Sequence, residues 1–208
     1  MDWKTFYKNV HPHFSSKRIE VGIRDWEQRS STIEQWIKKH KADHYVKILD
    51  CGCGVGTSGL ILKEKGFENI FGFDISNEDL KHAKKNYMVA KMDCHNIATS
   101  ENNFDIVIAM NLVEHIKNPG RFIEEAKRIL KKDGIIMLSA PNTILVRKII
   151  GRAPIQPDHI NSWNYDSFKK FLKIKNLKIL DAKPIGRVPL LSQCETFMIL
   201  AKPVDSNE

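Results

Sequence analysis

The chain of 208 residues is long enough for one well-buried core and short for two full domains, so we predict a single domain. Its composition, 42% hydrophobic and 28% charged, excludes the disordered, collagen-like and disulfide-stapled classes. The net charge is +8, and residues 141–188 carry most of it, with ten basic side chains against three acidic ones. This asymmetry indicates an acidic substrate, an anionic membrane or RNA beside that segment, or an ordinary solvated basic face.

The cysteines and the apolar runs bear on the compartment. The four cysteines form no CxxC pair, so we predict reduced thiols and no metal site. No apolar run approaches the roughly 18 residues that a membrane span needs, and the first residues lack a signal-peptide pattern. We therefore expect a cytoplasmic protein, and the sequence leaves its oligomeric state open.

The first 45 residues carry helical patterns. Ser31 and Glu34 form a capping box, which predicts that a helix begins there, and Ile33, Trp36 and Ile37 follow at helical spacing. An aromatic-rich stretch precedes this helix and is open to two interpretations, core packing or a lid; it contains Trp3, Phe6, Tyr7, Phe14 and Trp26.

From residue 46 onward, short apolar runs alternate with helical patterns. The runs predict strands at 46–50, 70–74, 87–92, 104–110 and 135–139. The intervening helices are predicted to follow the glycine-rich loop at 51–56, to run from 76 to about 86, and to run from 119 to 131. This alternation is typical of a parallel sheet with right-handed crossovers, so we predict a doubly wound α/β fold with helices on both faces of the sheet.

The end of the chain adds two strands. A helix at 165–174 precedes predicted strands at 177–182 and 196–201. Because a loop and not a helix joins these two strands, we expect the last strand to run antiparallel.

Glycines and carboxylates gather where the predicted parallel strands end, which is where an open α/β sheet binds its ligand. Asp50 ends the first strand, and Gly52, Gly54 and Gly56 follow it at every second position. This spacing allows a tight backbone turn close to a ligand, beside the free N–H groups of the next helix. Asp74 ends the second strand, where a carboxylate can accept both hydroxyls of a ribose.

The end of the third predicted strand also carries side chains that can bind a ligand. Asp93 and Cys94 lie there, and a carboxylate with a backbone amide can bind an adenine amino group and ring nitrogen. The three strand ends together predict a cofactor that contains adenosine.

A nicotinamide cofactor is the alternative. Residues 54–59 match GxGxxG, and Asp74 lies at a suitable distance for a dinucleotide fingerprint. Tyr165 and Lys169 also have the TyrxxxLys spacing of short-chain dehydrogenases. Against an NAD(P)-dependent oxidoreductase, an acidic residue precedes the glycine loop and no catalytic serine lies at a fitting upstream spacing. A Tyr and a Lys one helical turn apart are typical of surface packing.

Four segments in order carry a resemblance to a known family. IleLeuAspCysGlyCysGlyValGly at 48–56, PheAspIle at 73–75, MetAspCysHisAsnIle at 92–97 and LeuValGluHisIleLysAsnPro at 112–119 resemble the successive motifs of class I S-adenosylmethionine (SAM)-dependent methyltransferases. The resemblance implies a Rossmann-like, mostly parallel seven-stranded sheet with an antiparallel last strand. It also implies SAM as the cofactor.

The resemblance assigns roles to single residues. It implies that the methionine part of SAM lies against the three glycines, with Asp50 near its amino group, and that Asp74 holds the ribose. Asn111, after the fourth strand, would lie beside the cofactor. The implied cofactor-binding residues are Asp50, Gly52, Gly54, Gly56, Asp74, Ile75, Asp93, Cys94 and Asn111.

The acceptor is predicted to be a small molecule methylated on oxygen or nitrogen. Residues 139–163 are similar to methyltransferases of quinone-ring, sugar and natural-product pathways. His115 and His159 are the candidate catalytic residues, because imidazole titrates near neutral pH. Each has a structural alternative, in which His115 caps the helix region or hydrogen-bonds the backbone, and His159 locks the insertion.

The chain is predicted to divide by task. Residues 1–45 form a helical lid or acceptor segment, 46–140 the cofactor-binding core, 141–165 an insertion or lid, and 166–208 the C-terminal helix and strands. The apolar-basic stretch 144–152 is either a lid helix or an interfacial helix in peripheral contact with an anionic membrane.

Nucleic acid is not an expected partner. No AsnProProTyr-type tetrapeptide follows the fourth strand, so methylation of a base amino group has no motif support. An RNA-associated methyltransferase or binding module that uses the basic C-terminal third is the second alternative.

Overall fold

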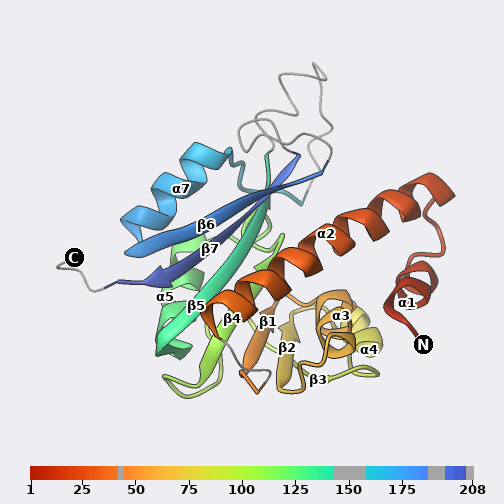
Figure 1. Ribbon diagram of the computed structural model, residues 1–208, viewed down its shortest axis with the longest axis horizontal. Coiled ribbons are helices and arrows are strands. Elements are labelled where there is room, and N and C mark those ends of the chain that lie inside the picture. Colours follow the sequence, from red (N-terminus) through yellow and green to blue (C-terminus); the bar gives the residue numbers. More distant parts are fainter. Residues whose placement is uncertain (42–44, 143–157, 187–194, 205–208) are drawn as a thin grey trace. The chain divides into compact units, whose positions relative to one another are not determined.

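The computed structural model describes residues 1–41, 45–142, 158–186 and 195–204. Its strands form one seven-stranded sheet in the order β3-β2-β1-β4-β5-β7-β6 (Figure 1). Strand β7 pairs antiparallel with both of its neighbours, β5 and β6, while the pairs β1–β2, β2–β3 and β4–β5 are parallel. The predicted doubly wound, mostly parallel fold with an antiparallel last strand is therefore confirmed.

The chain divides into two compact units, residues 1–94 and 95–208. The first unit contains helices α1 (Trp3–Val10), α2 (Ser16–His40), α3 (Thr57–Glu64) and α4 (Asn77–Ala83), and strands β1 (Ile48–Cys51), β2 (Ile70–Asp74) and β3 (Met88–Lys91). The second contains strands β4 (Phe104–Met110), β5 (Leu130–Pro141), β6 (Leu177–Ile185) and β7 (Thr196–Pro203), and helices α5 (Pro119–Ile129) and α7 (Tyr165–Ile174).

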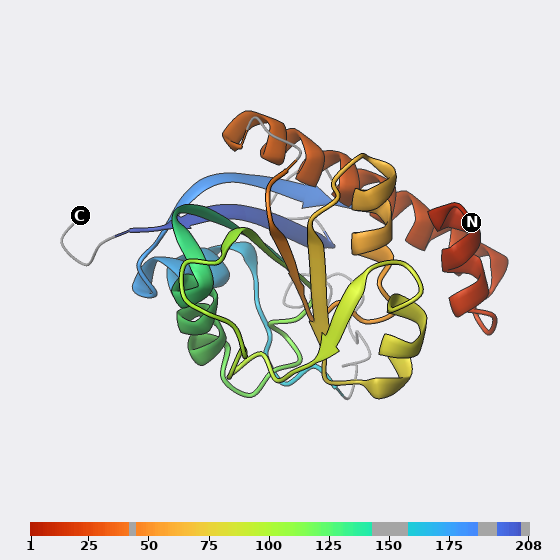
Figure 2. The same ribbon diagram turned by 90° about the horizontal axis from the view of Figure 1, so that it is seen from below.

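In the first unit, helices pack beside the parallel strands and against one another. Helix α3 packs on β2, and α4 packs on β2 and β3 (Figure 2). The aromatic stretch before residue 27 belongs to an apolar cluster, which confirms core packing for its buried members. This cluster joins α1 and α2 to α3 and contains Trp3, Phe6, Tyr7, Ile19, Leu60 and Ile61.

The predicted start of the long N-terminal helix was wrong. Helix α2 does not begin at Ser31 but runs unbroken from Ser16, with the Ser15 hydroxyl accepting a hydrogen bond from the Arg18 backbone N–H. Ser31 lies exposed in the middle of this helix. The apolar stripe that buries Ile19 continues to Ile37, and this long packed face decides the helix boundary over a local capping pattern.

In the second unit, α5 and α7 lie on the same side of β5, β6 and β7 (Figure 2). The predicted helix 119–131 ends two residues early, at Ile129, and the chain enters β5 at once. Phe104 pairs with Leu130 and Ile106 with Ile135, so the intervening residues of β5 form an irregularity in the ladder. The strand predicted at 135–139 therefore begins earlier, at Leu130, which already occupies a buried sheet position, and Asp133 and Gly134 lie within the irregularity.

Two sequence predictions concern membranes. Among the described residues, no helix combines the length and the apolarity that crossing a bilayer requires. The interfacial helix predicted at 144–152 lies outside the described residues.

Candidate active site

The loop after β1 is built from glycines in the left-handed backbone region. Gly52, Gly54 and Gly56 have φ angles of 64°, 52° and 90°, which residues with a side chain rarely adopt. A Cβ built on Gly54 would have no other heavy atom within 4 Å, apart from its chain neighbours. At Gly54 the backbone of this loop therefore borders open space, as close approach of a ligand requires.

Helix α3 begins at the end of this loop. Its N-cap is Gly56, which offers no side-chain hydrogen bond to the first turn. The first N–H groups of a helix lack intrahelical acceptors, and the helix dipole favours an anion there. This geometry suits the carboxylate of an amino acid moiety.

Asp74, at the end of β2, ties the glycine loop to the neighbouring strand. Its Oδ2 accepts a hydrogen bond from the Gly54 N–H at 2.8 Å, and its Oδ1 accepts one from the Ser76 N–H at 2.9 Å. A carboxylate oxygen can accept two hydrogen bonds, so both oxygens retain capacity for ribose hydroxyls. Sequence reasoning missed the bond to Gly54, which joins residues 20 positions apart.

Asp50 is buried, with an exposed fraction of 1%. Its Oδ2 accepts hydrogen bonds from the hydroxyls of Ser58 and Tyr87, the latter at 3.1 Å. Burial raises the pKa of the carboxyl from 3.8 to about 6, although the two hydroxyls act in the opposite direction. Asp50 is thus a carboxylate kept from water, in the same unit as the glycine loop and Asp74.

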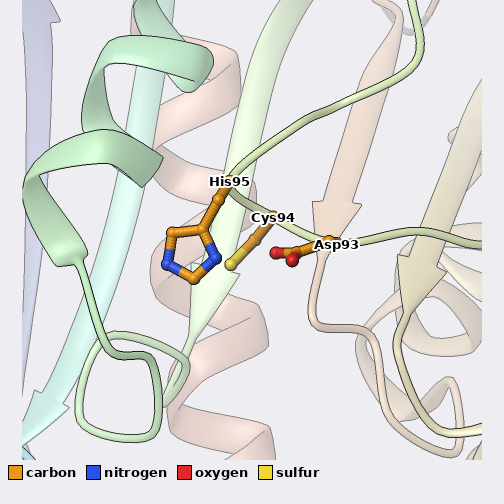
Figure 3. A group of neighbouring side chains, drawn as sticks. All are labelled: Asp93, Cys94 and His95. Atoms are coloured by element: carbon orange, nitrogen blue, oxygen red, sulfur yellow. The ribbon is translucent and has the colours of Figure 1, made fainter.

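The remaining predicted cofactor residues of the first unit lie after β2 and β3. Ile75 exposes 67% of its surface, which leaves an apolar face available for an adenine ring. Asp93 is exposed and Cys94 is buried, and Figure 3 shows the Asp93 carboxylate pointing toward Cys94, whose sulfur lies beside the His95 ring. Burial raises the pKa of the Cys94 thiol to about 12. Cys94 is therefore a neutral thiol at physiological pH.

In the second unit, Asn111 directly follows β4. Its φ of 54° is left-handed, a conformation that Asn tolerates better than most residues. The Asn111 N–H donates to the Ser139 hydroxyl at 3.0 Å, and that hydroxyl donates to the Asn111 side-chain oxygen at 2.7 Å. Ser139, which sequence reasoning had placed only in a strand, therefore fixes Asn111 at the end of β4.

The two candidate catalytic histidines lie together in the second unit. The ring centroids of His115 and His159 are 4.7 Å apart, in an edge-to-face arrangement. Nδ1 of His115 lies 3.2 Å from the backbone oxygen of Asp158 and 3.3 Å from its Oδ2. Nε2 of His115 lies 4.0 Å from Oε1 of the fully buried Glu114. Burial and the neighbouring His115 lower the pKa of His159, so its ring is neutral at pH 7.

Asn161 holds the His159 loop in place. Its side-chain amide donates to the backbone oxygens of Ile116, at 2.7 Å, and Val113, at 3.2 Å. Its N–H also donates to the Glu114 backbone oxygen at 3.0 Å. Sequence reasoning missed this residue, since no local pattern indicates a bond across some 45 residues.

Among the residues that the structure describes, two groups of side chains have the composition of metal ligands. In each, the potential ligand atoms lie within 4.8 Å of one another; the groups are Asp93, Cys94 and His95 (Figure 3), and Glu114, His115 and His159. The neutral Cys94 thiol weakens the case for the first group, because metals bind the thiolate. The expectation of no metal stays a prediction.

Tyr165 and Lys169 take part in packing. Tyr165 opens α7 and places its ring edge-on to Phe197 of β7, with centroids 5.9 Å apart. The Lys169 ammonium lies 5.8 Å from the centroid of the Tyr165 ring. This geometry agrees with the packing interpretation of the pair.

A comparison with protein families decides between the two cofactor classes. A family model described as a methyltransferase domain matches residues 18–182. The chain belongs to this methyltransferase family. SAM is therefore its cofactor and methyl transfer its activity, in the 2.1.1 enzyme class, and the NAD(P)-dependent alternative is wrong.

Individual relatives agree with this assignment. The chain is 29% identical, over 82% of its length and 72% of the relative's, to a ubiquinone biosynthesis O-methyltransferase from Pelagibacter ubique. It shares the fold of a SAM-dependent methyltransferase from Clostridium acetobutylicum (TM-score 0.71, 16% identity, 96% of both chains). It also shares the fold of magnesium protoporphyrin IX methyltransferase from Synechocystis, solved with bound S-adenosylhomocysteine (SAH) (TM-score 0.70, 16% identity, 92% and 89% of the chains).

The curated relatives are longer than this chain. The chain spans between 47% and 72% of the length of the first four that it matches.

Asp74 offers a test of the ribose position. We expect Asp74→Asn to weaken SAH binding about 10- to 100-fold, because hydrogen bonds to a charged acceptor contribute about 1.5–3 kcal/mol. Isothermal calorimetry measures this loss. Asp74→Ala should in addition lower the unfolding temperature, since the N–H groups of Gly54 and Ser76 lose their acceptor. Glu78→Gln, at an exposed carboxylate of the next helix, is the control. An unchanged SAH affinity in Asp74→Asn would place the ribose elsewhere.

Proposed function

We propose that the protein methylates a hydroxyl oxygen of a small aromatic acceptor of the quinone-precursor type. SAM supplies an electrophilic methyl group, and a phenol is a good nucleophile only after it loses its proton. The observation that supports an oxygen acceptor is the contact between His115 and His159, which provides a base beside the carboxylate of Asp158. The names of several curated relatives, ubiquinone biosynthesis O-methyltransferases, support the same acceptor class.

Within this proposal, His115 removes the acceptor proton. Asp158 accepts a hydrogen bond from Nδ1–H and so fixes the ring in the tautomer with a free lone pair on Nε2. When Nε2 takes the proton, the carboxylate of Asp158, whose Oδ2 lies 3.3 Å from Nδ1, stabilises the positive ring. The neutral His159 accepts a hydrogen bond from the acceptor and orients it.

Substitution of the histidines tests these roles. We expect His115→Ala to lower kcat about 10²- to 10⁴-fold, the usual contribution of a general base, and His159→Ala to lower it less. SAH affinity should stay unchanged in both variants. His82→Ala, at a partly exposed histidine in the last turn of α4, is the matched control. Full turnover in His115→Ala with intact SAH binding would remove the base from the proposal.

We also propose that residues 1–45 contribute to the acceptor site, as the sequence predicted. Helices α1 and α2 and the turn between them enclose a hollow of about 700 Å³, a volume typical of sites for small molecules. Phe14, Ile19 and Ile23 give it an apolar wall, and Arg24 and Glu27 lie at its polar side. The same apolar cluster includes Val55 of the glycine loop, so the hollow and the loop share one packed core.

A screen of acceptors tests the proposed function. Purified protein is incubated with SAM and with matched sets of catechols, monophenols, primary amines and sugars, and SAH release is measured. We expect catechols and hydroxylated quinone precursors with an apolar substituent to be methylated fastest. The best acceptor should also shift the ring resonances of His11 and Phe14 in NMR spectra. Methylation of amines alone would overturn the oxygen assignment.

Several predictions on partners stay predictions. They are the cytoplasmic location, the peripheral contact with an anionic membrane, the absence of nucleic acid binding, and the division into segments 1–45, 46–140, 141–165 and 166–208. Salt-sensitive binding of RNA would favour the RNA-associated alternative.

A further inference from the structure

The ring of Tyr87 lies in a pocket made by glycines. A Cβ built on Gly59 would stand 2.2 Å from the Tyr87 ring, one on Gly72 would stand 2.9 Å from it, and one on Gly56 would stand 3.1 Å from it. Glycine at these positions therefore makes room for a single aromatic ring. Gly56 and Gly59 belong to the GxGxxG pattern that suggested a dinucleotide, and in this chain they serve a different purpose.

The hydroxyl of Tyr87 hydrogen-bonds to the buried Asp50 carboxylate and also to the Cys53 thiol. It donates to Oδ2 of Asp50 at 3.1 Å, and the Ser58 hydroxyl donates to the same oxygen. Neither hydroxyl donates to Oδ1. Because both donors converge on Oδ2, they fix the orientation of the carboxylate and leave Oδ1 to face other groups.

We propose that Tyr87 is a positioning residue for cofactor binding: its hydroxyl, together with that of Ser58, keeps the buried Asp50 carboxylate ionised and oriented toward the amino group of SAM. The inference rests on the proposed role of Asp50 at this amino group. A buried carboxylate needs such donors, because burial by itself favours the protonated form, which cannot pair with an ammonium.

The titratable and polar groups that face Asp50 define how SAH binding is expected to depend on pH. Ser58 faces it from α3, Cys51 from β1, Cys53 from the glycine loop, and Tyr87 from the segment after α4. Burial raises the pKa values of both thiols and of the tyrosine, so these groups stay neutral between pH 5 and 8. Among the described residues, Asp74 is a charged neighbour, and its charge disfavours ionisation of Asp50.

The pKa of Asp50 is about 6, so its charged form is lost as the pH falls through this value. We therefore expect the affinity of the wild-type protein for SAH to fall below about pH 6. The amino group of SAH is an ammonium throughout the range from pH 5 to 8, so its protonation does not mask the effect.

Tyr87→Phe tests the proposal, because the ring still fills the glycine pocket while the hydroxyl is lost. Calorimetric titration with SAH from pH 5 to 8 should show the midpoint of the affinity loss shifted upward by about one pH unit. Ser58→Ala should shift it in the same direction. A ¹³C NMR titration of the Asp50 carboxyl in the cofactor-free protein should give the same shift without any binding step. Tyr45→Phe, at a tyrosine that is 74% exposed, is the matched control and should leave the midpoint unchanged.

The outcomes separate the inference from its premise. SAH binding that weakens equally at every pH in Tyr87→Phe, with an unmoved Asp50 midpoint, would show that Tyr87 acts through packing alone and would overturn the proposal. An Asp50→Asn protein that binds SAH as the wild type does would instead overturn the role of Asp50. A third outcome combines tight SAH binding in Asp50→Asn with a shifted Asp50 midpoint in Tyr87→Phe. It would show that the hydrogen bonds to Asp50 exist but have no role in cofactor binding, which also overturns the proposal.

Discussion

Asp50→Asn is expected to give a protein that unfolds at a higher temperature and binds SAH at least about 100-fold more weakly. The side chain is 1% exposed, and its pKa of about 6, against 3.8 for an exposed carboxyl, shows that the ionised form is costly in the folded chain. A pKa difference of about two units corresponds to a loss of about 3 kcal/mol in the free energy of unfolding at pH 8. Asparagine avoids this loss, but part of the gain is offset because its amide N–H groups need acceptors. We expect a net gain of about 1–2 kcal/mol in the free energy of unfolding.

The sign of this effect depends on pH. A carboxyl with a raised pKa binds its proton more tightly in the folded state than in the unfolded state. The cost of its charge is therefore fully present above pH 6 and disappears as the pH falls toward 4. Thermal unfolding at pH 8 and pH 5 measures the change: the advantage of the variant should be large at pH 8 and small at pH 5. Glu101→Gln, at an exposed carboxylate, should show neither effect. A destabilised Asp50→Asn protein at pH 8 would mean that the carboxylate stabilises the fold.

Gly59→Ala is expected to destabilise the protein, against the usual rule for helices. Alanine inside a helix is normally about 1 kcal/mol more favourable than glycine. At position 59 of α3, the new Cβ would lie 2.2 Å from the Tyr87 ring, which is held by Gly72 on another side and buried. Overpacking of this kind typically costs about 1–3 kcal/mol. The displaced ring would also withdraw its hydroxyl from Asp50, so SAH binding should weaken with the stability.

Gly120→Ala is the matched control for this prediction. Gly120 lies in the first turn of α5, where a new Cβ would meet the flexible end of the Lys175 side chain at 2.9 Å. The lysine can move aside, so this change should be neutral or slightly stabilising. Chemical denaturation of the three proteins measures the difference. Equal stability of Gly59→Ala and the wild type would show that Tyr87 moves freely and is not held in a fixed pocket.

The sequence by itself determined those features that local patterns encode. Short continuous apolar runs predicted the parallel strands, because a strand that is buried on both faces is apolar throughout. Apolar residues at helical spacing predicted the crossover helices, because each helix buries only one face. The loop between the last two strands predicted that β7 is antiparallel. The glycines at 52, 54 and 56 predicted a tight backbone turn, and the structure has positive φ angles at all three.

Only the tertiary structure decided the features that depend on distant residues. Helix α2 begins at Ser16, because a long buried stripe outweighs the local signal at Ser31. Tyr87 meets Asp50 across 37 positions, and His115 meets Asp158 across 43. Such contacts leave no trace in local periodicity, since packing of whole elements, and not the residues between the partners, brings them together.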